Sequence, residues 1–215
     1  MLAARERRKR KEENMAFKDI RRKHIVTEAT RLFFERSIYD VKIREVAAKS
    51  GVGEATFYRY FTNRASLIVA CATLLQETVG AEYFHFEEGG TGFDKLSAFY
   101  AAFLKAFKEH IEYYRFLSEF DAYCIAEEVK GLDQYSEKLD VFKSFFIAAY
   151  EQGLKDGTVK AVKDVDLFYY STTHALLSLC KKLASQGNIV KQDELVNKKA
   201  EVTLLRDLIL SALKK

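Results

Sequence analysis

Apolar side chains recur every three or four positions along most of this chain, which is the spacing of helices that bury one face. Strict alternation of apolar and polar residues, the signal of a half-buried strand, is missing from the sequence. Glycine-containing breaks at residues 88–92 and 186–188 separate the periodic segments, and there is no proline to interrupt a helix. The pattern predicts an all-α fold whose longer helices span residues 17–36, 64–86, 94–108, 111–128, 132–156, 164–184 and 193–213.

Residues 43–61, with the sequence IREVAAKSGVGEATFYRYF, contain two short helical stretches on either side of Gly51. A short helix, a turn of three or four residues containing Gly, and a second short helix over residues 54–60 make a helix-turn-helix. Gly suits this turn because a positive φ costs other residues about 1–2 kcal/mol. The residues expected to hold the two helices together are Ala47, Val52 and Phe57. Those left facing outward are Glu54, Ala55, Thr56 and Arg59.

This segment resembles the DNA-binding domain of TetR-family transcriptional regulators, and the resemblance covers about residues 22–70. The positions that match in order and spacing are Leu32, Phe33, Val46, Ala47, Gly51, Val52, Thr56, Tyr58, Phe61, Arg64 and Leu67. The family usually has Gly at position 37, Thr or Ser at positions 41 and 53, and Lys at position 64, where this chain has Ser, Val, Gly and Arg. The first three differences alter a loop and two helix starts, and none of the four removes the motif.

The resemblance implies a three-helix DNA-binding domain over residues 17–62 and a six-helix domain over residues 63–215 for ligand binding and dimerisation. It implies a regulator, of the repressor kind, that binds a pseudo-palindromic DNA operator as a homodimer. The residues implied to face base edges are Arg44, Glu54, Ala55 and Thr56. Those implied to hold phosphates are Lys42, Tyr58, Tyr60 and Arg64.

Charge is distributed unevenly along the chain. Residues 1–70 hold 17 Lys and Arg against nine Asp and Glu, whereas the rest of the chain has a small acidic excess. A basic first segment joined to an acidic remainder suits a polyanion-binding domain on a body without such a partner. The extension over residues 1–16 lacks apolar periodicity, and its first 14 residues are expected to be disordered or a frayed helix. It is either a basic arm for DNA or a stretch without function.

Aromatic residues are concentrated in the predicted body, where 21 of the 29 Phe and Tyr residues lie between positions 83 and 170. They form either an ordinary helical core or the wall of a cavity for a small, largely apolar or aromatic ligand. Buried tyrosines need hydroxyl partners, and the resemblance adds weight to the cavity. The candidate pocket residues are Tyr113, Phe116, Phe120, Tyr123, Phe146, Tyr150 and His174.

The last two helices carry apolar residues on more than one face, which is more than a single core requires. The resemblance implies that they pair with their copies in a second subunit; burial within one chain is the alternative. The candidate interface residues are Leu176, Leu179, Cys180, Leu183, Val202, Leu205 and Ile209. A body that only dimerises or binds a protein, without a small effector, is the second reading of its function.

Sequence signals for catalysis, metal binding and cofactors are missing. The four histidines are far apart with no second ligand at helical spacing, and the phosphate-loop and nucleophile-elbow motifs do not occur. Three widely separated cysteines are typical of reduced thiols. No apolar stretch is long enough to span a membrane and no signal peptide is visible, so we expect a cytoplasmic protein that is not an enzyme.

Overall fold

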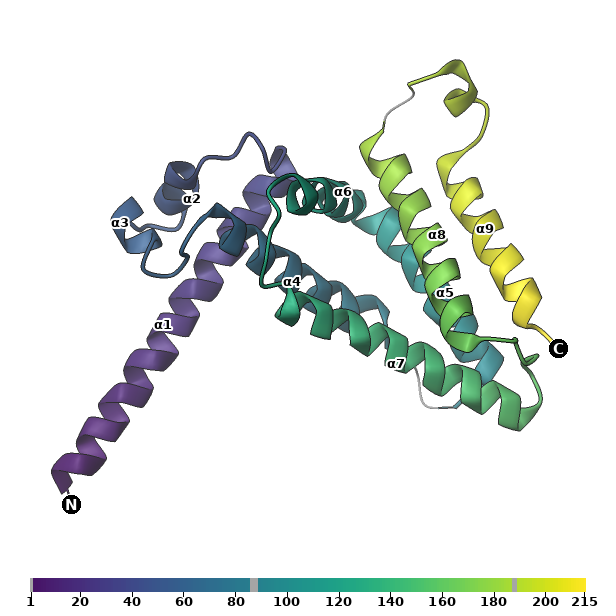
Figure 1. Ribbon diagram of the computed structural model, residues 1–215, viewed down its shortest axis with the longest axis horizontal. Coiled ribbons are helices and arrows are strands. Elements are labelled where there is room, and N and C mark those ends of the chain that lie inside the picture. The colour runs from purple at the N-terminus through teal and green to yellow at the C-terminus, as the bar shows by residue number, and fades with distance from the viewer. Residues whose placement is uncertain (1, 86–88, 187–188) are drawn as a thin grey trace. The chain divides into compact units, whose positions relative to one another are not determined.

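The computed structural model describes residues 2–85, 89–186 and 189–215 (Figure 1). Nine α-helices and one short 3₁₀ helix lie in these ranges, where the only β-type pairing is an isolated bridge between Val159 and Lys214. The predicted all-α fold is therefore confirmed. The chain divides into two compact units, Met1–Leu74 and Leu75–Lys215, and the boundary falls inside helix α4 (Arg64–Tyr83).

The first unit contains α1 (Leu2–Glu35), α2 (Ile43–Lys49), α3 (Glu54–Phe57) and the beginning of α4. Helix α1 packs on α2, and α2 packs on α3. The core side chains come from the apolar face predicted for α1 and from the two short helices. They include Ile25, Ala29, Phe33, Val46, Ala47, Phe57, Phe61, Leu67 and Ile68.

Two elements of the first unit differ from the prediction. Residues 2–14, expected to be disordered or frayed, continue α1 without a break, because Arg, Lys and Glu are good helix formers and no Gly or Pro interrupts them. Helix α3 ends at Phe57, where residues up to 60 were expected to be helical. The chain nevertheless stays tightly turned, since the amides of Tyr60 and Phe61 both donate to the Phe57 carbonyl, at 2.9 and 3.1 Å.

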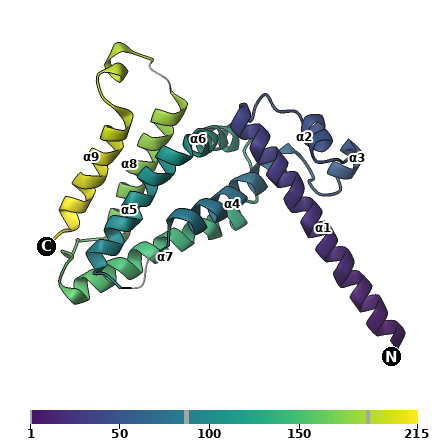
Figure 2. The ribbon, with the colours of Figure 1, turned by 180° about the vertical axis from the view of Figure 1, so that it is seen from behind.

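The second unit contains the rest of α4 and five more helices. Four of these begin and end within two residues of the predicted bounds, whereas the last begins at Lys198, five residues after its predicted start. They are α5 (Gly92–Glu109), α6 (Ile111–Ala126), α7 (Asp133–Asp156), α8 (Val165–Ser185) and α9 (Lys198–Leu213), with the 3₁₀ helix η1 (Lys191–Glu194) before the last. Helix α5 is central, because it packs against each of the other four (Figure 2). The predicted end of α4 at residue 86 and the breaks at residues 88 and 187–188 lie outside the described residues.

Two glycines set the crossing of α5 and α7. A Cβ on Gly92 would lie 2.0 Å from the Gly153 nitrogen, so the two backbones touch where only glycine fits. The Gly92 amide donates to Asp156 at 2.7 Å, and Thr158 donates through both its amide and its hydroxyl to the same carboxylate. These hydrogen bonds hold the pKa of Asp156 below its ordinary value. The start of α5 and the end of α7 are therefore fastened together.

The chain end is fixed at the same side of the second unit. The Lys160 amide donates to the Leu213 carbonyl at 2.7 Å, and the Lys215 amide donates to the Thr158 carbonyl at 3.2 Å. This short pairing anchors α9 to the segment that follows α7. None of the helices in the described ranges is long and apolar enough to cross a membrane.

We predict that Gly92→Ala lowers the free energy of unfolding of the second unit by about 3 kcal/mol, because the added methyl must push two backbones apart. The measurement is denaturant unfolding of the full chain. Gly80→Ala is the matched control: its Cβ meets only the Phe142 ring, at 3.4 Å, and alanine favours the helix. Equal stability losses in the two variants would contradict the steric argument.

Candidate nucleic-acid interface and body cavity

The turn between α2 and α3 is built by short-range hydrogen bonds. Gly51 has φ of 65°, the conformation for which the sequence predicted glycine. The Val52 amide donates to the Ala47 carbonyl at 3.0 Å, and the buried Ser50 hydroxyl donates to the Val46 carbonyl at 2.7 Å. The turn therefore satisfies the carbonyls at the end of α2 and starts α3 in a fixed direction.

The buried side of α3 is aromatic. The Phe57 ring is fully buried and stacks on Phe61, with ring centroids 5.3 Å apart. The guanidinium of Arg22, on α1, lies 5.0 Å from the centroid of the Phe61 ring, within cation–π range. Because Phe57 points inward, the remaining side chains of this four-residue helix are left toward solvent.

The residues predicted to contact DNA are accessible to different degrees. Those that are exposed are Lys42, Arg44, Glu54, Ala55 and Tyr58. Those that are half-buried are Thr56, Tyr60 and Arg64. All eight lie on α2, on α3 or on the turns that border them, or at the first residue of α4. Their accessibility agrees with a shared surface on the first unit, and their contacts with DNA stay a prediction.

Arg64 has a structural role that the sequence reading missed. Its guanidinium donates to the Val41 carbonyl at 2.6 Å and also to the Ile38 carbonyl. It therefore ties the start of α4 to the loop before α2. A guanidinium has five N–H donors, so a phosphate can still bind one that is left. No local sequence pattern links residues 38 and 41 to residue 64, so only the fold could reveal this contact.

A second link in the first unit is an ion pair between Arg36, just past the end of α1, and Glu45 on α2. The hydrogen bond from Arg36 is the main cause that holds the pKa of Glu45 below its ordinary value. Both groups are largely exposed, so the pair contributes little to stability and mainly orients α2.

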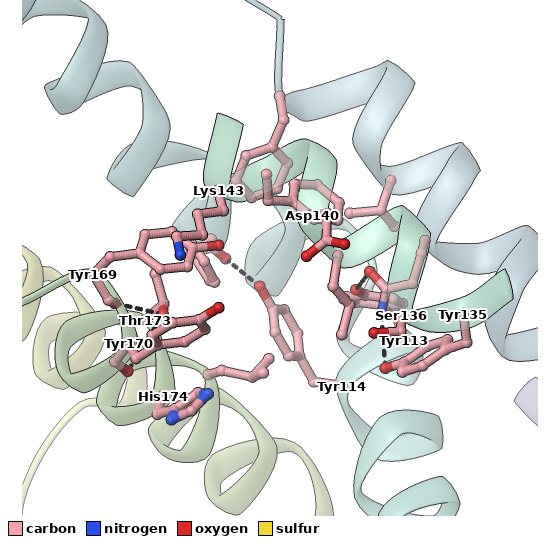
Figure 3. A pocket seen from close by; sticks show the side chains of 17 residues that line it. Tyr113, Tyr114, Tyr135, Ser136, Asp140, Lys143, Tyr169, Tyr170, Thr173 and His174 are labelled. Carbon is pink, nitrogen blue, oxygen red and sulfur yellow. Dashed lines mark hydrogen bonds between the residues drawn. The ribbon is translucent and has the colours of Figure 1, made fainter. Parts of the chain in front are cut away.

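The second unit contains a cavity of about 230 Å³ that is partly open to solvent, drawn in Figure 3. Helices α4, α5, α6, α7 and α8 all contribute to its wall. The apolar part of the wall comprises Val79, Phe84, Phe103, Leu139, Phe142 and Leu177. The part with polar atoms comprises Gln76, Tyr113, Tyr114, Tyr135, Ser136, Asp140, Lys143, Tyr169, Tyr170, Thr173 and His174.

One end of the cavity is organised by Gln76, a buried amide on α4. Its oxygen accepts from the Tyr113 hydroxyl at 3.0 Å, and its nitrogen donates to the Tyr135 hydroxyl at 3.2 Å. The Tyr114 hydroxyl donates to the Phe103 carbonyl at 3.0 Å. Burial raises the pKa of Tyr135 to about 12 and that of Tyr113 further still. These phenols are therefore neutral, and their hydroxyls are engaged within the protein, those of Tyr113 and Tyr114 as donors and that of Tyr135 as an acceptor.

The other end of the cavity, between α7 and α8, carries the charges. The Lys143 ammonium lies 3.1 Å from Asp166 and 4.9 Å from the centroid of the Tyr170 ring. Asp140 and Ser136 are on the same helix as Lys143, three and seven residues before it, so all three share one helical face. This spacing is visible in the sequence and could have identified the three residues, but the prediction followed the aromatic clusters instead.

Two of the seven predicted pocket residues, Tyr113 and His174, line the cavity. The other five lie outside its wall: Phe116, Phe120, Tyr123, Phe146 and Tyr150. All five are buried in the packing between helices. Phe146, for example, has a ring centroid 5.6 Å from Phe99 on α5 and 5.1 Å from Tyr169 on α8. Aromatic composition predicts burial, but it does not distinguish a packed core from a cavity wall.

Most of the residues predicted for a dimer interface lie on the inward side of α8 and α9. Five of the seven are buried in the body's own core: Leu176, Cys180, Leu183, Val202 and Ile209. Leu179 and Leu205 are half-buried. The exposed apolar side chains are instead Leu167 on α8 and Leu204 and Leu208 on α9. Because both sides of each helix are apolar, periodicity alone could not say which one faces inward.

The part of the chain that the structure describes holds no group of three or more His, Cys, Asp or Glu side chains arranged to bind a metal ion. His110 lies near the carboxylates of Glu82 and Glu112, at 3.6 and 3.4 Å, on a largely exposed surface. All three cysteines are free thiols, and burial raises the pKa of Cys71 and of Cys180 to about 12, which makes both poor nucleophiles.

Comparison with known proteins gives three findings. The family model for bacterial regulatory proteins of the tetR family matches residues 25–71. A search of curated protein sequences gives no match. Many solved structures share the fold of nearly the whole chain.

Three of these structures illustrate the similarity. The ketosteroid transcriptional regulator KstR2 of Mycobacterium tuberculosis has a TM-score of 0.61 at 15% identity, over 91% of this chain and 95% of that one. The fatty acid degradation regulator FadR from Bacillus halodurans has a TM-score of 0.60 at 16% identity, over 88% and 94%. RolR, in complex with its ligand resorcinol, has a TM-score of 0.61 at 18% identity, over 93% and 90%.

We predict that Arg64→Ala destabilises the first unit by about 1.5–3 kcal/mol, because it removes a charged donor from two backbone carbonyls. Thermal unfolding of the full chain, followed by helix content, measures the change. Lys42→Ala, on the same surface but exposed, is the control and should leave stability nearly unchanged. An Arg64 variant as stable as the control would show that the two carbonyl contacts contribute nothing.

Proposed function

Since the chain carries the DNA-binding domain of the TetR family of transcriptional regulators, we propose that it binds a pseudo-palindromic DNA operator as a homodimer and releases it when a small ligand fills the cavity of the second unit. A regulator that blocks transcription while bound to its operator, and that a ligand releases, acts as a repressor. The observation that carries the proposal is the accessible surface around α3, formed by a fixed turn and a buried Phe57.

The recognition surface suggests a division of labour. Arg44 is exposed on α2, and the side chains of Glu54 and Ala55 are exposed at the start of α3, where they are placed to meet base edges in a major groove. Lys42 and Tyr58 flank them and suit phosphate oxygens, which set position and carry no sequence information. Glu54 accepts hydrogen bonds only, so its base partner must be a donor such as the cytosine amino group.

A homodimer is supported by an apolar surface that the chain itself leaves uncovered. Leu204 and Leu208 are 62% and 59% exposed and lie one turn apart on α9, and Leu167 on α8 is 64% exposed. A second copy that covers these side chains brings two recognition helices to one operator, about 34–36 Å apart when they meet successive major grooves.

Ligand control rests on α4, which supplies residues to both units. Arg64 in its first turn binds the loop before α2, whereas Gln76 and Val79 line the cavity. A ligand that rearranges the hydrogen bonds of Gln76 changes the packing of the helix that also holds Arg64. It weakens DNA binding only to the extent that it prefers the released form. RolR, a protein of this fold, holds resorcinol, which is a precedent for a small polar aromatic ligand.

The alternative is a regulator whose body only dimerises or binds another protein. The cavity of about 230 Å³ favours the ligand-controlled reading, because a body with a purely structural role would gain stability by filling that space. A catalytic role has no specific observation in its favour in the described residues: no metal-binding cluster lies there, and the buried thiols resist ionisation.

Selection of bound DNA from a random pool is the decisive experiment. We expect a symmetric consensus, and Arg44→Ala should relax the preference at one base position in each half-site by about 1–3 kcal/mol. Lys42→Ala should weaken all sequences about equally. An asymmetric or absent consensus, with no effect of Arg44→Ala on sequence preference, would refute the proposed operator binding.

Deletion of residues 1–14 distinguishes a specific regulator from a non-specific nucleic-acid binder. The deletion removes six of the ten Lys and Arg residues that precede His24. We predict a modest loss of operator affinity with a shallower dependence on salt, because fewer counterions are released. Affinity for the consensus and for random DNA is measured over a range of salt concentrations. Loss of nearly all binding to both would favour the non-specific binder.

A further inference from the structure

The charges around the cavity do not cancel. Two of the lining residues carry a formal charge at neutral pH with histidine neutral, namely Asp140 and Lys143. The Lys143 ammonium is already compensated by Asp166, at 3.1 Å. The side-chain carboxylate of Asp140 has no ion pair or hydrogen bond with another residue that the structure describes. Asp140 is exposed where the cavity opens to solvent, and Figure 3 shows its carboxylate directed toward the cavity. The cavity with its immediate surroundings therefore carries an excess of one negative charge.

Much of the cavity wall is aromatic. Phe84, Phe142, Tyr169 and Tyr170 present rings to the cavity, and aromatic faces attract cations. The wall already holds one cation in this way, since Lys143 lies 4.9 Å from the centroid of the Tyr170 ring. Burial, with smaller contributions from Tyr170 and Asp140, raises the pKa of Tyr169, so its phenol stays neutral beside the carboxylate.

The hydrogen-bonding groups at the two ends differ in what they leave for a ligand. Tyr113, Tyr114 and Gln76 are used within the protein. At the charged end, the Tyr170 side chain is hydrogen-bonded to Lys143. The exposed side chains of Ser136 and His174 lie in the wall without a hydrogen bond to another described residue. An ammonium group has up to three N–H donors, which suit a carboxylate with neighbouring hydroxyl oxygens.

We propose that the cavity binds a small organic cation: an amine or ammonium group seated at Asp140 and carried on a single aromatic or short aliphatic body. The inference rests on the proposed function only in treating the cavity as a ligand site. Its volume of about 230 Å³ is roughly one and a half times that of a ~150 Å³ cavity that holds benzene, which leaves room for one ring and a short side chain. An anion would instead have to displace Asp166 from Lys143 and lie close to Asp140.

Three probes of nearly the same shape and different charge test the proposal. They are 2-phenylethylamine, 2-phenylethanol and phenylacetate, which at neutral pH are a cation, a neutral molecule and an anion. Calorimetric titration of the full chain, without DNA, measures each affinity. We expect the cation to bind at least about tenfold more tightly than either of the others. Equal affinities, stronger binding of the anion, or no binding of any probe at millimolar concentration overturns the proposal.

Two substitutions on α7 and one control locate the effect. Asp140→Asn should reduce the affinity for the cation about tenfold and leave 2-phenylethanol unchanged. Glu151→Gln removes one charge from the same helix at an exposed position outside the cavity and should change neither affinity. Unaltered cation binding by Asp140→Asn, with an unfolding temperature like that of the parent chain, refutes the assignment of Asp140.

A second substitution predicts a change in the opposite direction. Lys143→Met removes the only cation in the wall and leaves Asp166 uncompensated, so affinity for 2-phenylethylamine should rise by several-fold. If the cavity were built for anions, the same substitution would abolish phenylacetate binding without strengthening the amine.

Failure of this inference and failure of the proposed function give different results. Specific DNA binding with no preference for the amine rejects the cationic ligand and retains the regulator. Asp140-dependent binding of the amine to a protein without a symmetric DNA consensus retains the ligand class and rejects the operator.

Discussion

The second unit depends on the contact between the start of α5 and the end of α7. Gly92 and Gly153 approach so closely that a Cβ on the first would overlap the backbone of the second. Asp156 then fastens the Gly92 amide at 2.7 Å. Since α5 packs against α6, α7, α8 and α9, fixing its first residue fixes the axis around which the other helices are arranged. The close glycine contact and the Asp156 carboxylate thereby fix the point where α5 and α7 meet.

The cavity is lined by residues of α4, α5, α6, α7 and α8, and its polar groups need hydrogen-bond partners or solvent. Each buried tyrosine at the α4 end has a hydroxyl partner: Gln76 serves Tyr113 and Tyr135, and the Phe103 carbonyl serves Tyr114. Without those partners, each buried hydroxyl would cost about 1–3 kcal/mol. At the α7–α8 end, Ser136, Asp140 and His174 are exposed and their side chains have no hydrogen bond within the described protein, so a ligand can replace water there.

Apolar periodicity in the sequence was sufficient to predict most of the helices. The helices of the second unit and the helix-turn-helix follow from apolar spacing and from Gly51, whose φ of 65° is a local requirement that one residue type meets. The same reasoning failed at the recognition helix by one turn, because backbone hydrogen bonds to Phe57 tighten the chain there. The prediction for residues 2–14 also failed. It considered only the absence of an apolar face, although Arg, Lys and Glu have a high helix propensity.

The sites were predicted less completely, for a reason that particular residues make plain. Burial depends on which side of a helix faces inward, and Leu176 and Leu204 are equally apolar although one is buried and the other exposed. Phe146 and Phe142 belong to the same cluster in the sequence, yet only Phe142 lines the cavity. Arg64 binds carbonyls more than twenty positions away, a contact that depends on tertiary structure alone. Local patterns therefore predict that a residue is buried or requires a hydrogen-bond partner, whereas the tertiary structure determines which neighbours it contacts.

Helix α4 contributes hydrogen-bonding side chains to both units. Its first residue, Arg64, completes the hydrogen bonding of the loop before the helix-turn-helix, and Gln76, twelve positions later, completes that of the cavity's tyrosines. Twelve residues of α-helix span about 18 Å, and a hydrogen-bonded helix transmits rotation or translation along its axis with little loss. Neither end can be released without leaving polar groups unsatisfied. A ligand that offers Tyr113 or Tyr135 a different partner therefore changes the interactions of one end of a helix whose other end is fixed to the DNA-binding unit.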